Sequence, residues 1–160
     1  MIKIKFKTNE EKEFDMDSLD KANFDGNQLH AAIFDGLSLY KVSFIKANLR
    51  SANLSRCYLD ESIFVEALLM NACLSYSVLT NSDLSSSRLS GASFFKADMR
   101  RANLSQADVF AVEFKGADLR GADFRGVKRI GNANFHEALY DEETIWPESF
   151  SPKSQGLILI

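Results

Sequence analysis

The sequence predicts an all-β fold in which the backbone coils as a solenoid around one hydrophobic core. Three observations lead to this prediction. A large apolar residue recurs at every fifth position, a small residue recurs two places before it, and glycine recurs two places after it. A fixed repeat of this kind indicates stacked units, because each unit can bury its apolar face only against its neighbours.

The large apolar column runs without interruption through 22 positions, from Leu19 to Phe124 in steps of five. At a hydrophobic content of 46%, chance would produce such a run with a probability on the order of 10⁻⁸. An α-helix is excluded, since five residues turn it by about 500° and the column would drift around the axis. A straight strand is excluded too, because an odd spacing alternates between its two faces. The chain must therefore turn once in every repeat.

The other columns agree with this geometry. Alanine occupies 12 of the 22 places two residues before the large one, and serine or cysteine occupies five more. Residues two apart on extended backbone share a face, so both columns should point inward. The place between them is often asparagine or aspartate, which suits a solvated position beside a turn. Six of the eight glycines stand two residues after the large one, where a corner with positive φ is expected.

Several repeats read alanine, then asparagine or aspartate, then leucine and two further residues, for example Ala47–Ser51, Ala52–Arg56, Ala102–Gln106 and Ala117–Gly121. This pattern resembles the signature of pentapeptide-repeat proteins. The resemblance covers residues 17–126 and implies a right-handed quadrilateral parallel β-helix, with one pentapeptide per side and four per coil. About five and a half coils at a strand spacing of ~4.8 Å make a rod roughly 26 Å long.

We expect one domain with three parts: an N-terminal cap strand in residues 1–16, the repeat β-helix in residues 17–126, and a partial last coil with a C-terminal cap in residues 127–160. Caps are expected because an uncovered solenoid end is an unpaired strand edge. In the first part, Ile2, Ile4 and Phe6 alternate with lysines. One extra residue within Gly126–Ile130 shifts the register before the last part.

The C-terminal part carries two further indications. Ala138–Pro152 resembles the closing segment of many cyanobacterial pentapeptide-repeat proteins. The apolar tail Leu157–Ile160 is expected to cover the last coil, with a dimer contact as the alternative.

Composition narrows the function classes. A nucleic-acid partner would require a basic face, and a mildly negative net charge of −3 gives no indication of one. No apolar run is long enough for a membrane span, and the alternating N-terminus does not resemble a secretory signal. We therefore expect a soluble, cytoplasmic protein without a membrane partner. Cys57 and Cys73 are too few for a disulfide framework and are expected to be free thiols.

The sequence contains no pattern typical of catalysis. His30 and His136 lie on different parts of the predicted rod, and no cluster has metal-ligand spacing. Asp98 and Asp118, one coil apart, are interpreted as an exposed charge ladder neutralised by nearby arginines. The sequence therefore predicts no enzyme activity, catalytic residue, cofactor, metal or small-molecule substrate.

The candidate interaction surface comes from places where the outward columns become apolar, which together form a belt around the middle coils. Its residues are Tyr40, Ile45, Tyr58, Ile63, Val65, Leu68, Met70 and Val78. An exposed patch of this size is typical of an interface. The sequence thus favours a non-enzymatic interaction or scaffold module, with an unidentified protein partner or with self-association.

The alternative function is inhibition of a DNA topoisomerase (gyrase) by mimicry of duplex DNA, the activity of the quinolone-resistance branch of the resembling family. Those proteins are markedly acidic and dimerise through a C-terminal helix. The balanced charge and the proline-interrupted tail of this chain, which contains Pro147 and Pro152, depart from that pattern.

Overall fold

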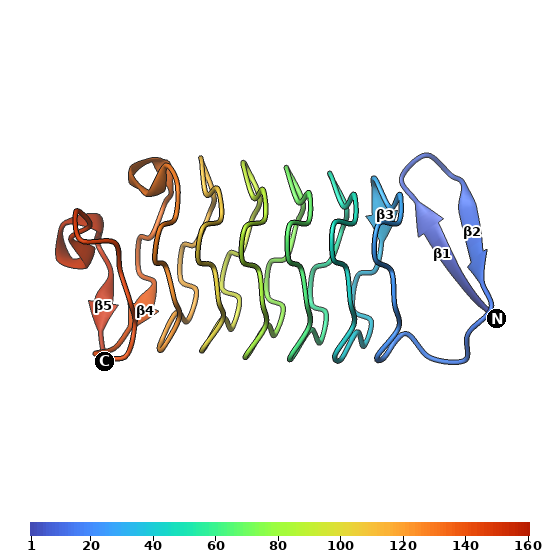
Figure 1. Cartoon of the computed structure of the whole chain (residues 1–160), viewed down its shortest axis with the longest axis horizontal. Coiled ribbons are helices and arrows are strands. Elements are labelled where there is room, and N and C mark those ends of the chain that lie inside the picture. Colours follow the sequence, from blue (N-terminus) through green and yellow to red (C-terminus); the bar gives the residue numbers. More distant parts are fainter.

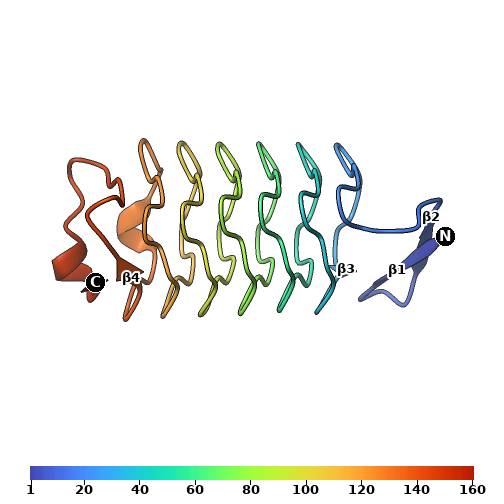
Figure 2. The same cartoon turned by 90° about the horizontal axis from the view of Figure 1, so that it is seen from below.

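The computed structural model describes residues 1–160, which form a rod of stacked coils with a hairpin at one end and a cap at the other (Figures 1 and 2). Isolated parallel β-bridges join residues 20 apart along the rod, as from Asn48 to Leu68 and from Leu68 to Arg88. Each coil therefore contains four five-residue repeats. The chain is a β-helical solenoid, as the sequence predicted.

Backbone hydrogen bonds between coils hold this stack together. Leu49 donates its N–H to the carbonyl of Leu68 in the next coil at 2.8 Å, and Ser51 donates to Met70 at 2.9 Å. The same pattern recurs repeat after repeat. Proline cannot donate such bonds, which explains why both prolines stand outside the repeats.

The core is the large apolar column. All 22 of its side chains are buried, with Leu19 the most exposed at 7%. Phenylalanine rings stack coil upon coil, with 5.4 Å between the centroids of Phe24 and Phe44 and 5.2 Å between those of Phe44 and Phe64. The small column lies inside as well from Val42 onward, whereas nearer the N-terminal end Asp17 and Leu37 are exposed and Ala22 and Asn27 are half-buried.

The corners between repeats adopt a left-handed backbone at all 22 positions from Lys21 to Gly126. Only six of these corners are glycine; the other 16 have φ between 52° and 62°. Such a conformation costs an ordinary residue about 1 kcal/mol or more. Position in the coil therefore decides the corner geometry, and glycine is the residue that adopts it at least cost.

The solenoid has four sides, which we number I to IV by their core residues. Side I contains Leu19, Leu39, Leu59, Leu79, Met99 and Leu119; side II contains Phe24, Phe44, Phe64, Leu84, Leu104 and Phe124; side III contains Leu29, Leu49, Leu69, Leu89 and Val109; side IV contains Phe34, Leu54, Leu74, Phe94 and Phe114.

The N-terminal cap is a hairpin. Strand β1 (Ile2–Phe6) pairs antiparallel with β2 (Glu11–Phe14) and with β3 (Ala32–Ile33) of the first coil. Ile4 is buried, and the ring of Phe14 meets Phe24 edge to face at 5.0 Å. The cap therefore pairs with side IV of the first coil through β1, and it covers the end of the core with Phe14 of β2. The sequence did not predict β2.

The coil beyond Phe124 is longer than a regular one. A 3₁₀ helix, η1 (Ile130–Asn132), absorbs one extra residue, so that Glu113 bridges to Asn134. A second extra residue makes Asp123 bridge to Ile145. The inward column continues through Phe135 and Tyr140 as far as Trp146, whose ring stacks on Phe124 at 4.6 Å.

The C-terminal tail adds one more strand. After the 3₁₀ helix η2 (Pro152–Gln155), strand β5 (Ile158–Leu159) pairs parallel with β4 (Leu139–Tyr140). Leu157 is buried, whereas the last three residues are exposed. The tail thus covers the last coil with its backbone and one side chain. No helix in the structure has the length and apolarity that crossing a membrane requires.

Candidate interaction surface

The eight apolar residues predicted as an interaction surface, which we call the apolar belt, lie on sides I, II and III. Two are well exposed: Tyr58, at 58%, and Ile63, at 36%. The other six are half-buried: Tyr40, Ile45, Val65, Leu68, Met70 and Val78.

On side I, Tyr58 and Val78 are bridge partners in successive coils, so their side chains stand one above the other. Tyr40 occupies the other outward column. Its hydroxyl donates to Glu61 at 3.2 Å, and the Lys41 ammonium stands over its ring at 5.1 Å. Tyr40 is therefore partly covered by its neighbours, whereas Tyr58 remains open to a partner.

Side II carries Ile45, Ile63 and Val65 within two successive coils. All three are β-branched and have few side-chain rotamers, so they lose little entropy on docking. Side III contributes Leu68 and Met70, both half-buried. Side II is consequently the most rigid apolar part of the belt.

Charged corners divide the belt. Between sides I and II, Lys41 pairs with Glu61 at 2.9 Å; between sides II and III, Lys46 lies 3.6 Å from Glu66. The belt is thus three apolar panels separated by ion pairs between coils. A flat partner can cover one panel, and only a partner that wraps the rod can cover all three.

Further exposed aromatic residues lie outside the belt. Tyr76 is 55% exposed at the corner between sides IV and I and meets Phe95 edge to face at 5.5 Å. On side III, Phe110 is covered by the Arg129 guanidinium at 4.6 Å. Phe110 occupies an outward column like those of the belt but lies beyond the middle coils. Tyr76 stands at a corner, a column that the belt does not include.

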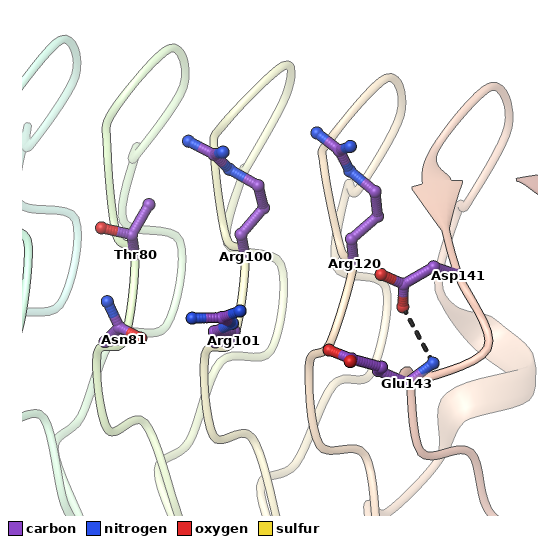
Figure 3. Close-up of a pocket in the computed structure, with 7 residues that line it drawn as sticks. All are labelled: Thr80, Asn81, Arg100, Arg101, Arg120, Asp141 and Glu143. Atoms are coloured by element: carbon purple, nitrogen blue, oxygen red, sulfur yellow. Dashed lines mark hydrogen bonds between the residues drawn. The ribbon is translucent and has the colours of Figure 1, made fainter. Parts of the chain in front are cut away.

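A polar cleft of about 420 Å³ opens on side I beyond the belt, towards the C-terminal cap (Figure 3). Seven residues from four successive coils line it, and none is apolar: Thr80, Asn81, Arg100, Arg101, Arg120, Asp141 and Glu143. This cleft was not predictable from the sequence, because Asp141 and Glu143 reach it only through the longer last coil.

The charge ladder expected at Asp98 and Asp118 forms one wall of this region. Arg100 pairs with Asp98 at 2.6 Å, Arg120 pairs with Asp118 at 2.6 Å, and Arg100 also lies 3.9 Å from Asp118. Burial acts to raise the pKa of Asp98, but hydrogen bonds from the Arg100 side chain and N–H outweigh it and hold that pKa below its ordinary range. Asp98 is therefore ionised near neutral pH, and the ladder is compensated by its own arginines.

The remaining titratable groups offer little chemistry. No group of three or more histidine, cysteine, aspartate and glutamate side chains is placed to hold a metal ion. Cys57 is buried and Cys73 half-buried, and both are free thiols, as predicted. Burial raises the pKa of the Cys57 thiol to about 11, which makes it unreactive near neutral pH.

Comparison with solved structures finds similar chains among cyanobacterial proteins. The pentapeptide repeat protein Rfr23 from Cyanothece 51142 is 25% identical, with a TM-score of 0.36 over 69% of this chain; this chain spans only 64% of its length. HetL from Nostoc sp. strain PCC 7120, involved in heterocyst differentiation regulation, is 24% identical, with a TM-score of 0.39 over 87% of this chain and 73% of its own.

A third structure, alr5209 from Nostoc PCC 7120, is 30% identical, with a TM-score of 0.24 over 74% of this chain and 84% of its own. No curated protein matches the chain. The family model for pentapeptide repeats matches in eight copies, over residues 38–75, 47–85, 72–109 and 87–126. These matched residues are more than half of the chain, which therefore belongs to the pentapeptide-repeat family.

Proposed function

We propose that the protein is a non-enzymatic interaction scaffold, built on a right-handed quadrilateral β-helix, whose apolar belt binds a protein partner or a second copy of the chain. The observation that carries this proposal is the pair Tyr58 and Ile63, exposed on adjoining sides of a rigid coil. The backbone beneath them is fixed by hydrogen bonds to both neighbouring coils, so docking orders little of the protein itself.

Charge favours this proposal over mimicry of duplex DNA. A duplex mimic needs a dense run of uncompensated negative charge. Here five of the nine aspartates of the outward columns are paired with arginines, as in Asp123 with Arg125 and Asp98 with Arg100. The phosphate-like face that gyrase would recognise is therefore neutralised along much of the rod.

The experiment is removal of the two exposed belt residues in the variant Tyr58→Ser/Ile63→Ser. Both side chains point outward, so the variant should keep its circular dichroism spectrum and lose association measured by sedimentation velocity or by binding to a purified partner. The matched control is Tyr76→Ser, which removes a similarly exposed tyrosine from a corner outside the belt. If the double variant associates as the unmodified protein does, or if the control loses association equally, the belt is not the working surface.

A further inference from the structure

The polar cleft on side I contains two charged side chains without a partner. Arg101 makes neither a side-chain hydrogen bond nor an ion pair, unlike its neighbours Arg100 and Arg120. The Glu143 carboxylate makes none either; only its backbone N–H is bound, to Asp141 at 3.2 Å. Both side chains line the cleft, and the Glu143 side chain extends towards Arg101 (Figure 3). The cleft thus offers one unpaired cation and one unpaired anion.

The paired arginines add donors to the same site. Arg100 uses Nε and Nη2 for Asp98, and Arg120 uses the same two nitrogens for Asp118. A guanidinium has five N–H groups, so each keeps about three of them for another acceptor. The two side chains come from successive coils, where the strand spacing is ~4.8 Å. They form a row of donors, held in place by Asp98 and Asp118, beside the unpaired guanidinium of Arg101.

Gly121 provides the space for this arrangement. A Cβ atom at Gly121 would lie 3.1 Å from Cγ of Arg101 and 3.7 Å from Oε2 of Glu143. Both charged side chains therefore pass over a residue that has no side chain of its own. Its N–H is bound to Asp141 at 2.9 Å, which fixes the floor of the cleft.

We infer that this cleft docks a segment of a partner protein that carries a carboxylate and a cationic side chain close together, with the carboxylate bound to Arg101 and the cation bound to Glu143. The two unpaired charges are of opposite sign, which disfavours polyanions such as nucleic acid. The absence of apolar lining disfavours an apolar peptide. The cleft also continues side I of the belt, since Val78 and Thr80 flank the same core residue, Leu79.

This inference rests on the proposed function in taking the partner to be a protein, and its test does not use the belt. The probe is the peptide acetyl-Gly-Glu-Gly-Lys-Gly-amide, together with one analogue in which glutamine replaces the glutamate and one in which glutamine replaces the lysine. Binding is followed by chemical-shift titration of the ¹⁵N-labelled protein. Each peptide is titrated against the unmodified chain and against Arg101→Gln, Glu143→Gln and the control Arg125→Gln, whose arginine lies on side II and outside the cleft.

The expected result is a specific coupling. Arg101→Gln should weaken binding of the parent peptide by about fivefold. This variant should then bind the parent peptide and the glutamate-free analogue equally well. Glu143→Gln should likewise weaken binding of the parent peptide and should bind it and the lysine-free analogue equally well. Arg125→Gln should leave the affinity for all three peptides unchanged. The belt variant Tyr58→Ser/Ile63→Ser should also bind the peptides normally, so failure of the belt and failure of the cleft are distinguishable.

Two outcomes would overturn the inference. In the first, the coupling of Arg101 to the peptide glutamate and that of Glu143 to the peptide lysine both stay below about twofold. Neither charge in the cleft then recognises a charge of the peptide. In the second, inorganic tripolyphosphate binds more tightly than the parent peptide and depends on Arg101, which makes the cleft a polyanion site.

Discussion

Replacing Phe44 by alanine should remove a large part of the stability of the rod. Phe44 is fully buried on side II, stacked 5.4 Å from Phe24 and 5.2 Å from Phe64, with Phe34 edge-on at 5.8 Å. Truncation of a buried phenylalanine costs about 3–5 kcal/mol. The upper half of that range is expected, because hydrogen bonds between coils fix their spacing and keep the cavity from closing.

Leucine at the same position is the matched control. Leu84 and Leu104 occupy the same column of side II, so the interior accepts a leucine there. Phe44→Leu should cost only about 1 kcal/mol, as volume-similar exchanges of apolar residues do. The difference between the two variants isolates the cavity from the loss of the aromatic stack.

The free energy of unfolding is measured by urea denaturation, with circular dichroism reporting the whole rod and the fluorescence of Trp146 reporting its C-terminal end. Trp146 stacks on Phe124, four coils from Phe44. Coincident midpoints would indicate one cooperative unit. The reasoning is refuted if Phe44→Ala costs less than about 2 kcal/mol, or if Phe44→Leu costs as much as Phe44→Ala.

Three further outcomes are expected. Hydrogen bonding from Arg129 lowers the pKa of Asp108 below its ordinary value of about 3.9. This pair therefore stabilises the fold above that pH and loses its effect as the pH falls further, so acid unfolding should become easier in Arg129→Met. At pH 8, iodoacetamide should modify Cys73 and spare the buried Cys57, and mass spectrometry of the native protein showing equal labelling would contradict the burial. Gly36→Ala should destabilise by about 1 kcal/mol in urea denaturation through its φ of +75° alone, since an added Cβ meets no atom within 4 Å; an unchanged midpoint would show that the corner carries no strain.

The repeat was predictable because the same physical demand recurs in every unit. In every repeat the large residue must fill the interior, the inward residue before it must be small enough to fit beside it, and the backbone must turn at the corner. The left-handed corners at residues such as Lys41 and Tyr76 were not predictable from residue type, since neither favours that conformation alone. They follow from closure of the coil and from hydrogen bonds to the neighbouring coils.

The ends of the rod were less predictable because they depart from the repeat. Strand β2 has no periodic signal; Phe14 marks it only by packing on Phe24. The two added residues of the last coil are absorbed in η1 and before Ile145. A sequence shows that the register slips, whereas the structure shows which side chains the slip brings together.

The candidate surface was predictable as a set of columns and not as a shape. A period of five and coils of 20 residues place Tyr58 beside Val78 without any coordinates. They do not show that Lys41 lies over Tyr40, because a long, flexible side chain can point in several directions. The division of the belt by ion pairs therefore required the structure.

In a solenoid the inward columns determine stability and the outward columns are free to vary, so a specific function must lie where an outward residue departs from what the fold requires. Tyr58 and Ile63 depart by being apolar and exposed, and Arg101 and Glu143 by being charged and unpaired. Tyr58 and the cleft share side I. An apolar anchor next to a polar docking point matches the apolar core and polar rim of ordinary protein interfaces. Because each can be removed without touching the core, separate loss of peptide coupling and of association would show whether one partner covers both.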